Sequence, residues 1–122
     1  MKYDVKKMHA FHFLPENSLA LSPHTEKYTS VISDIPSGEG MIGDNSYLLL
    51  WAKNEIEELN DAYGTEEFMD GIFLIGSDGA DNAYGIDVSG NFYEVPFIGM
   101  SNREALKIAS GFNEFIDTLW NR

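Results

Sequence analysis

The stretch LIGSDGADNAYGIDVSGNFYEVPFIGMS, from Leu74 to Ser101, decides the fold of this 122-residue chain. Short apolar runs alternate in it with turns of aspartate, serine and glycine, which is the pattern of β-hairpins. The runs Ala83 to Val88 and Asn91 to Val95 predict one hairpin, and Ile72 to Ile75 predicts a buried strand before it. This stretch therefore predicts an antiparallel sheet and does not by itself indicate a reaction.

Further strands are expected on the N-terminal side of this stretch. Ala10 to Leu14 predicts a strand with Phe11 and Phe13 on one face, and Ser46 to Trp51 is a continuous apolar run of strand length. The segment from Glu26 to Ile35 fits a helical stripe and a strand about equally well. Its β-branched residues favour a strand.

Two helices are expected. Lys53 to Tyr63 has apolar residues at helical spacing, and Gly64 is placed to end that helix in the left-handed conformation. Ser101 and Glu104 have the spacing of a capping box, which predicts a second helix running almost to the end of the chain. Its apolar face would carry Leu106, Ala109, Phe112, Ile116, Leu119 and Trp120.

Strands and helices do not alternate strictly, which is typical of the α+β class rather than of a parallel sheet. We therefore expect residues 1–122 to form a single domain, an antiparallel β-sheet with helices packed on it and the C-terminal helix across one face. The chain has no cysteine, no apolar run suited to a secretion signal and no 18-residue apolar stretch. A cytoplasmic protein is the expectation.

The negative charge is concentrated in the middle of the chain. The net charge is −12, and the segment from Asp34 to Glu94 contains fourteen carboxylates against one base, Lys53, a balance of −13. Such a field repels nucleic acid and anionic lipid and attracts basic partners. An acidic surface that serves only solubility is the alternative. Asp61 lies in the last turn of its expected helix, four residues after Glu57, where dipole and like charge both disfavour it.

The predicted hairpin offers a candidate anchor. If Ser89 and Gly90 form a two-residue turn, Ile86 pairs with Tyr93 and Tyr84 with Val95, which leaves Phe92 on the other face with Asp87 and Glu94. An exposed Phe92 framed by carboxylates would suit a protein interface. Two alternatives stay open: a helix covers that face and buries Phe92, or a type I turn starting at Asp87 shifts the register.

No catalytic residue, metal site or cofactor site is predicted. Gly38, Gly40 and Gly43 form G-x-G-x-x-G, but a strand-like run follows where a dinucleotide site needs a helix, so a turn is expected. The acids from Asp78 to Asp87 depart from the calcium-loop pattern and suit tight turns. His9 and His12 lack partner ligands of the usual types.

Two long segments carry a resemblance to a known family. The segments GEGMIGDNSYLLLWAKNEIEELNDAY (Gly38 to Tyr63) and Leu74 to Ser101, with the closing helix, resemble the SUKH superfamily in its cell-wall-assembly-regulator (Smi/Knr) branch, over about two-thirds of the chain. The chain departs from that family at Gly79-Ala80, where a double glycine is common, and at Leu14 to Ser18, which poorly matches the opening L-P-x-x-Y. The matching positions are Gly38, Gly40, Leu50, Trp51, Asn60, Tyr63, Gly76, Asp78, Gly79, Tyr84, Asp87, Val95, Pro96 and Phe97.

The resemblance implies a non-enzymatic protein, and many bacterial members of this superfamily look like immunity proteins that bind and block a toxin, often a nuclease. The expected partner is therefore a basic protein, with no nucleic acid or membrane partner and an open oligomeric state. A metal-dependent hydrolase using the Asp78 to Asp87 loop and an oligomeric scaffold are the alternatives. The candidate partner-binding residues are Glu55, Glu58, Asp61, Asp78, Asp81, Asp87, Phe92 and Glu94.

Overall fold

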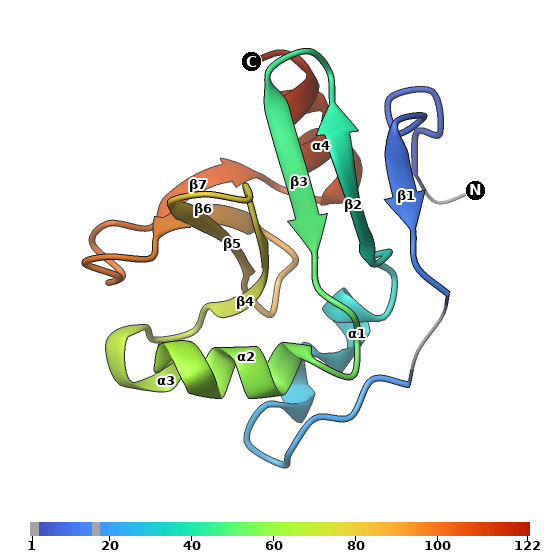
Figure 1. Ribbon diagram of the computed structural model, residues 1–122. Coiled ribbons are helices and arrows are strands. Elements are labelled where there is room, and N and C mark those ends of the chain that lie inside the picture. Colours follow the sequence, from blue (N-terminus) through green and yellow to red (C-terminus); the bar gives the residue numbers. More distant parts are fainter. Residues whose placement is uncertain (1–2, 16–17) are drawn as a thin grey trace.

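In the computed structural model, which describes residues 3–15 and 18–122, the strands form one antiparallel sheet whose order follows the chain (Figure 1). The expected α+β architecture is thereby confirmed. The strands within the described residues are β1 (Phe11–Phe13), β2 (Gly38–Ile42), β3 (Ser46–Leu50), β4 (Phe73–Ser77), β5 (Asn82–Ile86), β6 (Phe92–Pro96) and β7 (Leu106–Ala109). The helical elements there are η1 (Glu26–Tyr28), α1 (Thr29–Ile32), α2 (Ile56–Tyr63), α3 (Thr65–Phe68) and α4 (Phe112–Trp120).

The C-terminal helix α4 packs across one face of the sheet, as expected. Phe115 stacks on Phe92 with ring centroids 4.6 Å apart and meets Tyr84 edge to face at 5.0 Å. At the far end of the helix, the hydroxyl of Ser46 donates a 2.8 Å hydrogen bond to the carbonyl of Leu119. The helix thus spans the sheet from β7 to the start of β3.

This helix is shorter than the sequence predicted. Leu106 to Ala109, expected on its apolar face, instead form the edge strand β7, paired with β6. The Ser101 hydroxyl does accept a hydrogen bond from the backbone N–H of Glu104 (3.3 Å), but this contact closes an isolated turn. Pairing with β6 overrides a local pattern that fits a helix.

In the segment from Glu26 to Ile35, where helix and strand were both left open and a strand was favoured, the structure has the helical elements η1 and α1. Tyr28 and Ile32 point into the core, and the Tyr28 ring stacks on Phe73 with centroids 4.9 Å apart. Packing against β4 therefore outweighs the β-branched residues. The poorly matched segment Leu14 to Ser18 includes Glu16 and Asn17, which lie outside the described residues.

The predicted turn at Gly38 and Gly40 is a strand. Both residues lie in β2, and a Cβ atom at Gly40 would stand 2.1 Å from the carbonyl oxygen of Ala10. These glycines therefore let β1 approach β2. Only Gly43, with a φ of +73°, sits in a turn, and the strand β3 follows it. The G-x-G-x-x-G sequence therefore forms strand β2 and the start of the following turn, and it lacks the helix that binds a pyrophosphate.

The hairpin of β5 and β6 has the shifted register. Its turn starts at Asp87, whose carbonyl accepts a hydrogen bond from the N–H of Gly90 (3.1 Å), and Gly90 has a φ of +85°. Ile86 consequently pairs with Phe92 and Tyr84 with Glu94. A shift of one residue moves a side chain to the other face of a sheet, so Phe92 and Glu94 face α4.

Candidate functional site

The exposed acids and aromatics closest in sequence gather where α2 meets α3. Gly64, with a φ of +67°, ends α2 in the left-handed conformation that the sequence predicted, and α3 begins at the next residue. We call the surface from Asp61 to Asp70 the α2–α3 corner. Besides Ala62, its exposed side chains are four acids and two aromatics, namely Asp61, Glu66, Glu67, Asp70, Tyr63 (43% exposed) and Phe68 (51% exposed).

A single buried amide fixes the corner to the sheet. The Asn60 side chain accepts a hydrogen bond from the N–H of Leu74 and donates one to its carbonyl, both 2.8 Å long, and it donates a third to Ile56. The register pairs of β3 with β4 are Leu49 with Ser77 and Leu50 with Gly76. The amide of Asn60 therefore binds Leu74 as a neighbouring strand would, and α2 takes that place.

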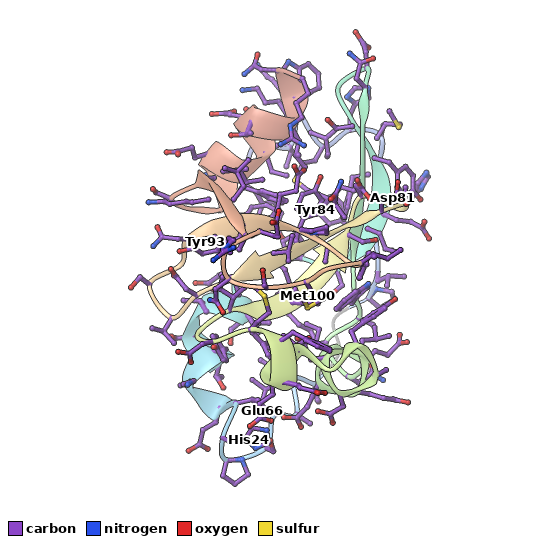
Figure 2. The ribbon with its side chains drawn as sticks, turned by 90° about the vertical axis from the view of Figure 1, so that its left-hand side faces the viewer. His24, Glu66, Asp81, Tyr84, Tyr93 and Met100 are labelled. Carbon is purple, nitrogen blue, oxygen red and sulfur yellow. The ribbon has the colours of Figure 1, made fainter. Side chains whose placement is uncertain are left out.

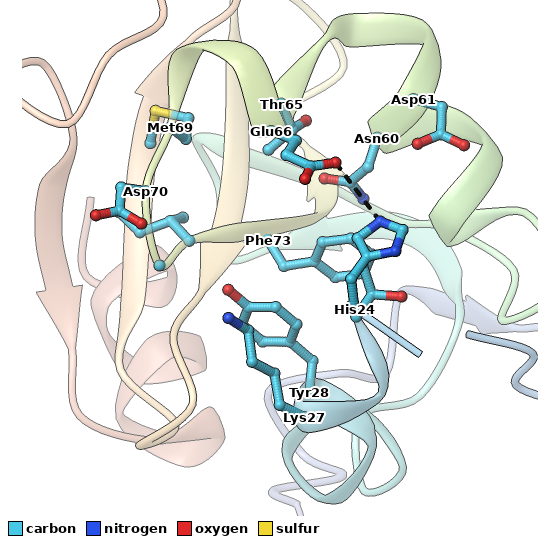
Figure 3. A pocket seen from close by; sticks show the side chains of 13 residues that line it. His24, Lys27, Tyr28, Asn60, Asp61, Thr65, Glu66, Met69, Asp70 and Phe73 are labelled. Carbon is cyan, nitrogen blue, oxygen red and sulfur yellow. Dashed lines mark ion pairs between the residues drawn. The ribbon is translucent and has the colours of Figure 1, made fainter. Parts of the chain in front are cut away.

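A pocket of about 260 Å³ opens beside the corner, between η1 and the segment from α3 to β4 (Figure 3). Acids line one side of it, namely Asp61, Glu66 and Asp70. A shallower hollow lies next to the pocket and shares Asn60, Asp61 and Glu66 with it. The pocket is lined in full by His24, Thr25, Lys27, Tyr28, Asn60, Asp61, Thr65, Glu66, Met69, Asp70, Gly71, Ile72 and Phe73.

The pocket rim that faces α3 carries His24 and Thr25, and a side chain of α2 holds this rim in place. The carboxylate of Glu57 accepts hydrogen bonds from the hydroxyl of Ser22 (2.6 Å), from its backbone N–H (3.0 Å) and from the hydroxyl of Thr25. These bonds lower the pKa of Glu57 below its ordinary value. His24, between the two anchored residues, reaches across the pocket to Glu66, with Nε2 and Oε2 3.5 Å apart.

Aromatic rings form another wall of the pocket. Tyr28 stacks on Phe73, and the Lys27 ammonium lies 5.5 Å from the centre of the Tyr28 ring. Burial raises the pKa of the Tyr28 hydroxyl, and the nearby carboxylates of Asp70 and Asp87 raise it further. The Tyr28 hydroxyl therefore stays protonated at neutral pH, under the negative electrostatic potential of Asp70 and Asp87.

The carboxylates of the corner are largely unengaged. Among the described residues, no hydrogen bond or ion pair joins the carboxylates of Asp61, Glu67 or Asp70 to another side chain. The backbone of Asp70 is fixed by two 2.7 Å hydrogen bonds with the Asn102 side chain. Lys53, the one base of the acidic segment, is buried and donates to the carbonyl of Ile35, so it adds no exposed cation.

The structure brings together only some of the candidate partner-binding residues. Glu55, Glu58 and Asp61 are exposed at or on α2, and Asp61 lines the pocket. Asp81 is exposed in the turn between β4 and β5, and Figure 2 places it far from His24 and Glu66. Asp81 therefore does not belong to the surface at the corner.

Asp78 and Asp87 build hairpin turns of the same design. Each carboxylate accepts backbone hydrogen bonds from the second and fourth residues after it, and a side-chain bond from an asparagine at the fourth, Asn82 or Asn91. Asp87 also accepts a bond from the Tyr93 hydroxyl (2.9 Å). Burial alone would raise the pKa of Asp87, but these hydrogen bonds outweigh it and lower the pKa. Strand β5, roughly 17 Å long at about 3.3 Å per residue, separates the two turns.

The interpretation of Phe92 as an exposed anchor is wrong, and the alternative that a helix buries it is confirmed. Phe92 is 1% exposed because the observed register turns it toward α4. Glu94 shares that face and forms a 2.6 Å ion pair with Arg122. Neither residue presents a free side chain to a partner.

The exposed aromatics of the corner were not among the sequence candidates. Tyr63 was assigned to the apolar stripe of α2, and in the structure it stacks on Trp51 and contacts Phe97, with centroids 6.0 and 4.7 Å away. Its ring nevertheless stays 43% exposed. The other exposed residues of the corner follow the predicted helix end at Gly64, namely Glu66, Glu67, Phe68 and Asp70. Their only signal in the sequence was a high density of charge beside aromatic residues.

Within residues 3–15 and 18–122, no group of three or more histidines and acids is arranged to hold a metal ion. No helix in the same residues has the length and apolar character needed to cross a membrane. No protein-family model matches the sequence, and no curated protein matches it significantly.

Proposed function

We propose that this chain is a cytoplasmic, non-enzymatic protein-binding module of the SUKH superfamily, an immunity protein that binds and neutralises a basic toxin of the nuclease type. The observation that carries the proposal is the α2–α3 corner, which exposes two aromatic side chains and three carboxylates that form no side-chain hydrogen bond or ion pair with the described residues. The family assignment rests on the sequence resemblance, and the binding role rests on this surface.

The composition of the corner suits a protein interface. Aromatic side chains are enriched in the energetically dominant part of interfaces, and Tyr63 and Phe68 expose about half of their surface. Asp61, Glu67 and Asp70 can pair with lysine or arginine without first breaking an internal ion pair. Complementary charge would speed encounter with a basic partner and fix its orientation.

The negative charge of the corner also provides a mechanism by which the toxin would be neutralised. A nuclease needs a basic surface to grip phosphate, and an acidic protein bound there would block access of nucleic acid. A chain with a net charge of −12 would also be repelled by nucleic acid itself. The proposed activity is therefore competition for the basic surface of the toxin.

The test is binding to the product of the neighbouring gene, because an immunity protein is expected beside its toxin. Calorimetry at increasing salt should give an affinity that falls with ionic strength. The double variant Asp61→Asn/Asp70→Asn should weaken binding at least about tenfold, since each removes a carboxylate close to the partner.

The matched control is Asp44→Asn/Asp81→Asn, which changes the net charge equally at exposed positions in the turns after β2 and β4. It should keep an affinity close to that of the wild type. Equal weakening by both double variants, or an affinity indifferent to salt, would contradict the proposed surface.

A further inference from the structure

We infer that the pocket beside the α2–α3 corner receives a single arginine side chain of the basic partner. The inference names the recognition chemistry of the proposed function and rests on it for the identity of the partner. The pocket itself can be tested without any partner.

The pocket is small. Its volume of about 260 Å³ lies at the lower end of the scale of ligand sites, which run from roughly 300 to 1,000 Å³. A single long side chain entering from a bound protein is of the right scale. The methylene groups of such a side chain would lie along the apolar lining residues Met69 and Ile72.

Charge selects a cation. Asp61, Glu66 and Asp70 line the pocket against one permanent cation, Lys27, which leaves an excess of negative charge. Glu66 forms an ion pair with His24, and both side chains are mostly exposed, so this weak pair can open. A guanidinium would offer two parallel N–H groups to a carboxylate here, which an ammonium cannot do.

Two further features favour a cation that donates hydrogen bonds. The Lys27 ammonium lies 5.5 Å from the centre of the Tyr28 ring, so the aromatic wall of the pocket already accommodates one cation. Thr65, which also lines the pocket, is 3% exposed, and its hydroxyl is the buried side-chain polar atom that lacks a hydrogen-bond partner among the described residues. Such an atom gains from a donor supplied by a ligand.

The experiment is a titration of the ¹⁵N-labelled full chain with N-acetyl-arginine amide at low salt, followed by NMR. We expect saturable shifts of the backbone amides of Thr65, Asp70 and Gly71. N-acetyl-citrulline amide, which is neutral and nearly the same shape, should produce no saturable shift at these amides. The variant Glu66→Gln/Asp70→Asn should weaken arginine binding at least tenfold, whereas Asp44→Asn/Asp81→Asn should leave it unchanged.

Equal shifts with citrulline, or arginine shifts spread over all acidic surfaces and insensitive to Glu66→Gln/Asp70→Asn, would overturn the arginine pocket. The two proposals can fail separately. Salt-dependent binding of a basic toxin without an arginine response in the pocket would leave the proposed function and remove this inference. A specific arginine response in a chain that binds no basic protein would leave this inference and remove the proposed function.

Discussion

Replacing Asn60 by alanine should loosen the attachment of α2 to the sheet. The substitution removes the hydrogen bonds to the N–H and carbonyl of Leu74, a residue that is 0% exposed. A buried backbone group left without a partner costs about 1–3 kcal/mol, so two such groups cost roughly 2–6 kcal/mol. We expect a loss in the lower half of that range, about 3 kcal/mol, because the structure relaxes around the substitution.

Urea unfolding followed by tryptophan fluorescence and circular dichroism measures this loss. A domain of this size should also melt roughly 10 °C lower. Asn54→Ala, at an exposed position just before α2, is the matched control and should change the stability by less than about 0.5 kcal/mol. Asn60→Asp keeps the shape of the side chain but cannot donate to the Leu74 carbonyl, so it should be at least as damaging as alanine.

The result that would refute the reasoning is a cost below about 1 kcal/mol for Asn60→Ala in a folded protein, because a typical single hydrogen bond contributes that much on balance. A mild Asn60→Asp beside a severe Asn60→Ala would also count against it. That outcome would assign the effect to lost volume rather than to the hydrogen bonds.

Three further predictions follow from buried or bonded residues. Gly76→Ala should abolish folding or cost more than about 3 kcal/mol in the same urea titration, because its Cβ would lie 2.1 Å from the Leu49 carbonyl oxygen, whereas Gly111→Ala meets open space and should be tolerated. Phe92→Ala should cost about 3–5 kcal/mol, and a cost below about 0.5 kcal/mol would contradict its burial. Hydrogen bonds lower the pKa of Glu57, so its contribution to stability is present above the ordinary value of 4.5 and is lost as the pH falls through the lower folded-state value. Glu57→Gln should therefore flatten the loss of stability below pH 4.5, and an unchanged slope in acid unfolding would contradict this role.

The fold class could be predicted because its signals are local. Glycine after Tyr63 ended a helix as expected, and apolar runs between turns marked the strands from β3 to β6. The register of the β5–β6 hairpin could not be predicted from local signals, because a turn on Ser89 and Gly90 and a turn starting at Asp87 are both compatible with the local residues. A single residue of shift decided whether Phe92 was buried.

Errors arose where distant contacts decide the structure. Leu106 to Ala109 fit a helical face by spacing, and only pairing with β6 makes them a strand. Tyr28 fits either structure until Phe73 packs on it. The acidity of the middle segment was evident from the sequence, but its use was not, since Asp78 and Asp87 bond their own turns while Asp61 and Asp70 face solvent.

The position of α2 and α3 beside the sheet also affects how substitutions can change the binding surface. All the exposed residues of the corner belong to one continuous segment between β3 and β4, and Asn60 rather than a strand joins that segment to Leu74. Substitutions from Asp61 to Asp70 can therefore alter charge and shape without disturbing any pairing between strands. Such an arrangement allows the chain to diverge in specificity while its scaffold stays the same.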